Sequence, residues 1–136
     1  MPINAVSHLP VPTGPFAEET TTTQDLVDGL LTPIRVRAGR TLIAEGSVGR
    51  EFFVIAEGRA EVRRDGEVMN ELGPGDYFGE LALMGEARRT ASVVAVTDMQ
   101  VMVANPREFR ALLEISPRFA RSLEQTVTDR RLALAS

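Results

Sequence analysis

The chain of 136 residues contains no cysteine and a single histidine, His8. Without cysteine it can form no disulfide, offer no thiol nucleophile and build no thiolate metal site. The lone histidine, in a proline-rich N-terminal segment, excludes a metal site built from several histidines and leaves triad chemistry without a suitable base. We therefore expect no metal cofactor and no enzymatic activity.

Long hydrophobic runs are also missing, since no stretch of about 18 consecutive apolar residues occurs. We expect no membrane span, and the N-terminus lacks the basic-then-apolar order of a secretory signal, so a cytoplasmic location is the default expectation. The net charge of −4 argues mildly against nonspecific nucleic-acid binding, although a pocket's local field can still attract a small anion. An apolar content of 43% is typical of a soluble globular domain.

The N-terminal part differs in composition from the rest of the chain. Residues 1–23 hold four prolines and four consecutive threonines, which predicts an irregular leader. The leucine and valine spacing over Gln24–Leu31 predicts a short helix. We expect a single folded domain over residues 24–136, because the length suits one core and no internal repeat is present.

From about residue 34 the apolar residues alternate with polar ones, and turn residues recur every eight to twelve positions or so. The predicted strands are Ile34–Arg37, Thr41–Ala44, Phe52–Ile55, Ala60–Arg64, Val68–Leu72, Thr90–Thr97 and Gln100–Asn105. This pattern predicts an antiparallel β-roll, or jelly roll, of about eight strands. Pro106 and Pro117 then open two predicted C-terminal helices, with Asn105 and Ser116 as their caps.

The most informative segment runs from Phe78 to Val93 and reads FGELALMGEARRTASV. It combines a glycine at the start of a short helical step, the carboxylate of Glu80 and the guanidinium of Arg89. A phosphate group favours exposed N–H groups at a helix N-terminus together with a forked cation. A neighbouring hydroxyl favours a fixed acceptor such as an ionised glutamate. The segment therefore predicts a site for a phosphate diester with a nearby hydroxyl.

This segment resembles the phosphate-binding cassette of the cyclic nucleotide-binding domain family. Residues 24–134 share the order of elements of that family's fold, which is mainly β: a lead helix, an eight-stranded roll, a short cassette helix and two C-terminal helices. Further landmarks are Gly39, Gly46, Phe52–Ile55 with Gly58, and Gly73–Asp76. The RRTASV form and the closing helices look most like ion-channel and prokaryotic members. The resemblance implies a non-catalytic sensor of cAMP, cGMP or both, whose final helix moves on ligand binding.

The resemblance also implies roles for residues of the cassette. Gly79 would let the backbone approach the phosphate, and the amides of Leu81 and Ala82 would face it, unless this glycine serves only a turn. Glu80 would accept a hydrogen bond from the ribose 2′-hydroxyl, or simply favour the helix N-terminus. Arg89 would grip the cyclic phosphate through a charge-assisted contact.

Other residues are candidates for contacts with the phosphate or the purine. Thr90 and Ser92 would offer hydroxyls near the phosphate or the purine edge, or serve only as β-formers. Arg130 would stack on the purine from the final helix, or only favour that helix's last turns. Val62 and Leu72 are candidates to line the purine. Arg88, beside Arg89, is expected to face outward, because neighbours on a strand point to opposite faces.

Several alternatives stay open at this point. The sequence does not decide between cAMP and cGMP, and it does not identify the protein effector that would act as partner. The chain could be a β-roll interaction or dimerisation module that has lost its ligand, or the regulatory domain of a larger channel or enzyme. A homodimer through the last helix, which carries Leu132 and Leu134, is also open. A metal-dependent cupin is disfavoured because His8 is the single histidine.

Overall fold

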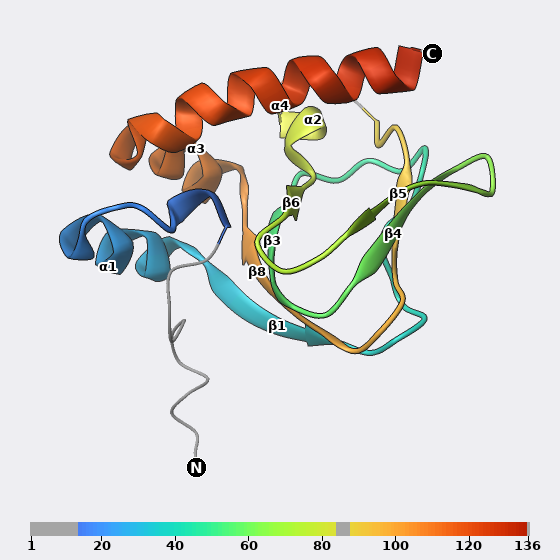
Figure 1. Ribbon diagram of the computed structural model, residues 1–136, viewed down its shortest axis with the longest axis horizontal. Coiled ribbons are helices and arrows are strands. Elements are labelled where there is room, and N and C mark those ends of the chain that lie inside the picture. The colour runs from blue at the N-terminus through green and yellow to red at the C-terminus, as the bar shows by residue number, and fades with distance from the viewer. Residues whose placement is uncertain (1–13, 84–87, 136) are drawn as a thin grey trace.

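The computed structural model describes residues 14–83 and 88–135, and for Ala82 and residues 131–135 it describes the backbone alone (Figure 1). Within this part of the chain, two four-stranded antiparallel sheets form a roll, with strand orders β1-β8-β3-β6 and β2-β7-β4-β5. The strands are β1 (Thr32–Val36), β2 (Thr41–Ile43), β3 (Phe52–Glu57), β4 (Ala60–Arg64), β5 (Glu67–Leu72), β6 (Tyr77–Phe78), β7 (Ser92–Ala95) and β8 (Met99–Ala104). The predicted eight-stranded antiparallel roll is confirmed.

Helical elements precede the roll, interrupt it and follow it. They are the 3₁₀ turn η2 (Gly14–Phe16), α1 (Thr21–Leu30), α2 (Glu80–Leu83), α3 (Pro106–Ile115) and α4 (Pro117–Ala135). Figure 1 shows α4 running across one end of the roll, with the short α2 beneath it. The cassette helix and the two C-terminal helices thus lie where the sequence predicted them.

Strand β3 contributes side chains to two hydrophobic cores, one on each face of its sheet. Phe52 and Val54 belong to a core between this sheet and the helices, whereas Phe53 and Ile55 belong to a second core inside the roll. Successive side chains of a strand point to opposite faces, so a strand that is buried on both faces reads as a continuous apolar run. This is the origin of the FFVI sequence.

The N-terminal segment contributes more to the fold than its composition predicted. Helix α1 begins at Thr21 rather than Gln24, because the Thr20 hydroxyl accepts the N–H of Thr23 and caps the first turn. Phe16 is 3% exposed and its ring lies 4.9 Å from that of Phe119, centroid to centroid. Residues 1–13 lie outside the described residues, so the boundary at residue 24 stays a prediction.

Helix α3 has the N-terminal cap that the sequence predicted. The Asn105 side chain accepts the backbone N–H of Glu108, and the Glu108 carboxylate accepts the N–H of Asn105, both at 2.8 Å. We expect Asn105→Ala to lower the free energy of unfolding by about 1 kcal/mol, because the backbone N–H of Glu108 at the helix N-terminus loses its acceptor. Urea denaturation would measure this. The exposed Arg107→Ala, in the same first turn, should change stability by less than about 0.5 kcal/mol, and an equal effect of both variants would contradict the capping role.

The start of α4 is fixed by a buried hydroxyl. Ser116, which is 0% exposed, accepts the N–H of Phe119 and donates to the carboxylate of Glu19. Further along, Thr126 receives a 2.7 Å hydrogen bond from the Tyr77 hydroxyl. The bond to Glu19 fixes the start of α4 to the segment before α1, and the bond from Tyr77 holds α4 against β6; the C-terminal half of α4 passes over α2 (Figure 1).

Candidate ligand-binding site

A cavity of about 200 Å³ lies between the β2-β7-β4-β5 sheet, α2 and α4. Its lining includes eight of the residues singled out from the sequence: Val62, Leu72, Gly79, Glu80, Leu81, Arg89, Thr90 and Arg130. The remaining lining residues are Ile43, Met69, Asn70, Phe78, Ala91 and Val93. Charged groups from α2, α4 and the segment before β7 thus share one space with apolar side chains of the sheet.

The guanidinium of Arg89 is buried at the cavity wall, with 6% of the residue exposed. Its Nη1 donates to the Gly79 carbonyl at 3.0 Å, and its Nη2 donates to the Glu51 carbonyl at 3.1 Å. Burial lowers the pKa of Arg89, and the nearby carboxylates of Glu51 and Glu80 oppose this shift. An anion bound in the cavity would offset the same desolvation, so the position is suited to a phosphate.

The backbone around Arg89 explains its fixed position. The Arg89 N–H donates to Ser47 and its carbonyl accepts from Gly46, both at 2.8 Å, so the residue pairs with the β2–β3 loop and not with a strand. Because of this pairing, β7 begins at Ser92, two residues after the predicted start at Thr90. Gly79 has φ +94°, and a Cβ there would lie 2.5 Å from the Glu51 carbonyl oxygen. A glycine is therefore required by the close approach of two backbone segments.

Glu80 and Arg130, which both line the cavity, form a charged pair. Glu80 is 1% exposed, and its Oε1 accepts a 2.6 Å hydrogen bond from Arg130 Nη1. Arg130 Nη2 also donates to the Tyr77 carbonyl at 2.7 Å, and its guanidinium carbon lies 5.3 Å from the centre of the Tyr77 ring. The final helix is therefore joined to the cassette through a buried carboxylate.

The other predicted residues lie in different places. Ser92 does not line the cavity, and its hydroxyl accepts the Glu45 N–H at 2.9 Å. Ala82 lies in α2, and its side chain is outside the described residues. Arg88 is exposed, as the sequence predicted. Its guanidinium donates a hydrogen bond to the Gly46 carbonyl at 2.9 Å.

Ile43 and Asn70 line the cavity but were not singled out from the sequence. Ile43 ends β2 and is 7% exposed, and its β-branched apolar side chain within a predicted strand could have identified it as a buried position. Asn70 lies on β5, where the pairing with β4 shifts by one residue between Val62 and Arg63. Nothing in the local sequence indicates that shift.

Comparison with known proteins identifies the class to which this fold and site belong. The family profile described as the cyclic nucleotide-binding domain matches residues 33–116, and the chain belongs to this family. A cyclic nucleotide-gated potassium channel of Rhizobium etli is 36% identical over 101 residues, which are 74% of this chain and 28% of the channel. The cGMP-dependent protein kinase egl-4 of Caenorhabditis elegans is 40% identical over 81 residues, 60% of this chain and 10% of the kinase.

A solved structure shows the same architecture. The structure of cAMP-bound PfPKA-R superimposes with a TM-score of 0.80 at 28% identity, covering 89% of this chain and 42% of that chain. This chain thus spans less than half of the length of each of these proteins. In the described residues, no cluster of three or more histidine or acidic side chains could hold a metal ion. The helices of this part are too short or too polar to cross a membrane.

Proposed function

We propose that this chain is a non-catalytic sensor that binds a cyclic nucleoside monophosphate, cAMP or cGMP, in the cavity between the sheet, α2 and α4. The observation that carries the proposal is that Arg89 and Glu80 line the same cavity, beside an apolar wall. The family relationship supports it, since relatives include a cGMP-dependent kinase and a cAMP-bound protein of the same fold.

The proposed ligand would lie with its phosphate at the charged end of the cavity. There the Arg89 guanidinium faces the cavity, and the backbone amides of Leu81 and Ala82 belong to the first turn of α2. Glu80 would accept a hydrogen bond from the ribose 2′-hydroxyl while keeping its pairing with Arg130. The purine would lie against the apolar wall that includes Val62 and Leu72.

The output of the sensor would be a change in the position of α4. Arg130 and Thr126 attach this helix to Glu80 of the cassette and to Tyr77 just before it. A ligand that binds Glu80 and the cavity wall will favour the arrangement of α4 that it contacts best, by the difference in its affinity for the two states. A partner protein or an attached domain would read that change.

The proposal is tested by ligand-dependent stability. At a ligand concentration of about one hundred times Kd, cAMP or cGMP should raise the free energy of unfolding by about 2.7 kcal/mol. Thermal or urea unfolding with increasing nucleotide would measure this, with 5′-AMP and 5′-GMP as controls that carry the same bases without the cyclic phosphate. A folded protein whose stability responds to neither cyclic nucleotide would overturn the proposal.

A further inference from the structure

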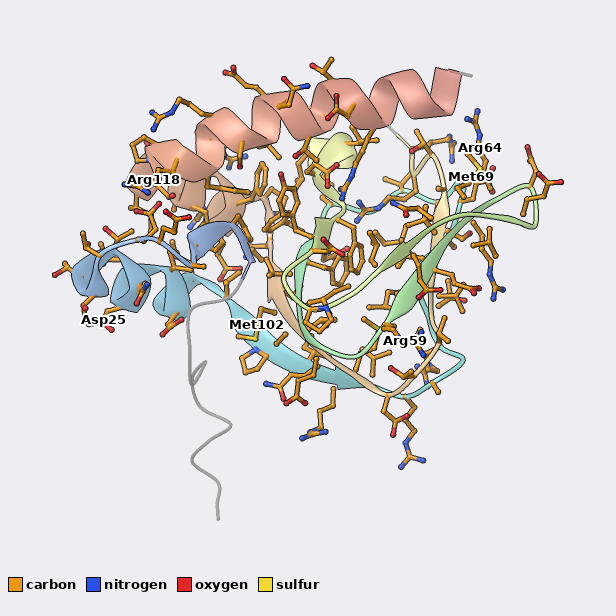
Figure 2. The ribbon with its side chains drawn as sticks, viewed as in Figure 1. Asp25, Arg59, Arg64, Met69, Met102 and Arg118 are labelled. Atoms are coloured by element: carbon orange, nitrogen blue, oxygen red, sulfur yellow. The ribbon has the colours of Figure 1, made fainter. Side chains whose placement is uncertain are left out.

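The chain contains no cysteine and no tryptophan, so the methionine sulfurs are its side-chain groups most readily oxidised by a peroxide. Three methionines have side chains that the structure describes, namely Met69, Met99 and Met102. Met99 and Met102 are each 2% exposed and belong to the two hydrophobic cores, whereas Met69 is 46% exposed. Figure 2 labels Met69 on β5 and Met102 on β8. An oxidant in solution therefore reaches the sulfur of Met69 far more readily than the other two.

The backbone of β5 brings Met69 to the wall of the cavity. Val62 of β4 pairs with Asn70, and the next residue of β4, Arg63, pairs with Val68. Met69 has no partner on β4 and is the extra residue of a β-bulge. It lines the cavity beside apolar side chains of the same sheet. The side chain of Met69 is thus both open to solvent and part of the wall that a ligand would cover.

We propose that Met69 is an oxidation site, where a peroxide forms methionine sulfoxide and thereby weakens the binding of the cyclic nucleotide. The thioether sulfur attacks one oxygen of hydrogen peroxide, and an S–O bond forms as the O–O bond breaks. The other oxygen leaves as water with both protons, so that sulfur loses two electrons and the peroxide gains them. The effect on affinity rests on the proposed function, whereas the oxidation of Met69 requires no bound ligand.

The sulfoxide changes the chemistry of the cavity wall. Its oxygen is a polar acceptor, and the neighbouring side chains of Val62 and Leu72 offer it no hydrogen-bond donor. A ligand that covers the sulfoxide removes water from it, so we expect affinity for cAMP and cGMP to fall about tenfold. By linkage, a bound nucleotide should also disfavour the oxidation of Met69, because the ligand covers the sulfur that the peroxide must reach.

The test treats the full chain with hydrogen peroxide and follows each methionine by peptide mass spectrometry. We expect Met69 to be oxidised at least about tenfold faster than Met99 and Met102. Saturating cAMP or cGMP should slow the reaction at Met69. Isothermal titration of protein oxidised at Met69 should show about tenfold weaker binding of both nucleotides than untreated protein. Reduction by methionine sulfoxide reductases should restore the affinity.

Two variants assign the effect to this sulfur. Met69→Leu keeps an apolar side chain of similar volume, so it should bind both nucleotides like wild type and retain that affinity after peroxide treatment. Met69→Gln places a polar group on the wall without any oxidant and should bind about tenfold more weakly, with urea unfolding to show that it is folded. Equal losses in peroxide-treated Met69→Leu and wild type would overturn the role of Met69. The effect would then belong to another residue, such as Met84, which lies outside the described residues.

The outcomes separate this inference from the proposed function. Unchanged affinity of wild type that is fully oxidised at Met69 overturns the inference and leaves the proposed function intact. Oxidation of Met69 no faster than that of the buried Met99 also overturns the inference alone. Failure of untreated wild type to bind either cyclic nucleotide overturns the proposed function, and the effect on affinity with it.

Discussion

Replacing Arg89 by glutamine is expected to weaken binding of both cAMP and cGMP by about 2–5 kcal/mol, a loss of roughly 30- to 5,000-fold in affinity. The expected loss of binding free energy is large because Arg89 is buried. The residue is 6% exposed and its guanidinium is held by the carbonyls of Gly79 and Glu51, so water screens its charge little. Both nucleotides should lose affinity equally, because they share the cyclic phosphate. Isothermal titration of the variant with each ligand would measure the loss.

The adjacent arginine provides the matched control. Arg88→Gln removes the same charge from an exposed side chain that donates to the Gly46 carbonyl, and it should change affinity by no more than about twofold. Arg89→Lys keeps the charge without the fork that reaches two carbonyls, and it should lie between wild type and Arg89→Gln. Urea unfolding without ligand would show that each variant is folded. Equal affinities of folded Arg88→Gln and Arg89→Gln would disprove the phosphate role of Arg89.

Features with a local physical cause were predictable from the sequence. The alternation of apolar and polar residues, together with the turn residues, located seven of the strands. The strand that was missed, β6, has two residues and is too short to show any alternation. The caps at Asn105 and Ser116 follow from side chains that bond to the next turn of the same helix. Glu80 and Arg89 could be placed in one site because they lie within one short segment.

Features that depend on distant segments were not predictable in this way. Phe16 lies between prolines and glutamates, and its burial depends on Phe119, about a hundred residues away in the chain. Likewise, Arg130 is expected to reach the purine, but nothing in the sequence indicated that its guanidinium bonds to the Glu80 carboxylate and the Tyr77 carbonyl. The β5 bulge that brings Asn70 into the cavity results from pairing with β4, and no local residue preference marks it.

The second large effect is expected from Arg130→Met, which keeps an unbranched apolar side chain and removes the guanidinium charge. Glu80, at 1% exposure, then loses the cation that lies 2.6 Å from its carboxylate. A buried charge without its partner typically costs about 3–5 kcal/mol, so the variant should be destabilised by that order. Urea unfolding in the absence of ligand would measure the change.

The exposed ion pair at the start of the same helix is the matched control. Arg118 lies 3.4 Å from Glu18, and both side chains are mostly exposed (Figure 2 labels Arg118). Arg118→Met should cost less than about 1 kcal/mol, because solvent already screens that pair. Similar costs for Arg118→Met and Arg130→Met would show that Glu80 is not effectively buried.

Removing both members of the pair distinguishes a buried charge from lost packing. Glu80→Gln should be milder than Arg130→Met, since Arg130 is partly exposed and a neutral amide can still accept its hydrogen bond. In the double variant no unpaired charge remains, so its destabilisation should be smaller than the sum of the single effects by at least about 1 kcal/mol. Additive effects would mean that Arg130 stabilises α4 only through its contacts with Tyr77. A large coupling would instead make Glu80 the link through which a bound ribose can influence the position of the final helix.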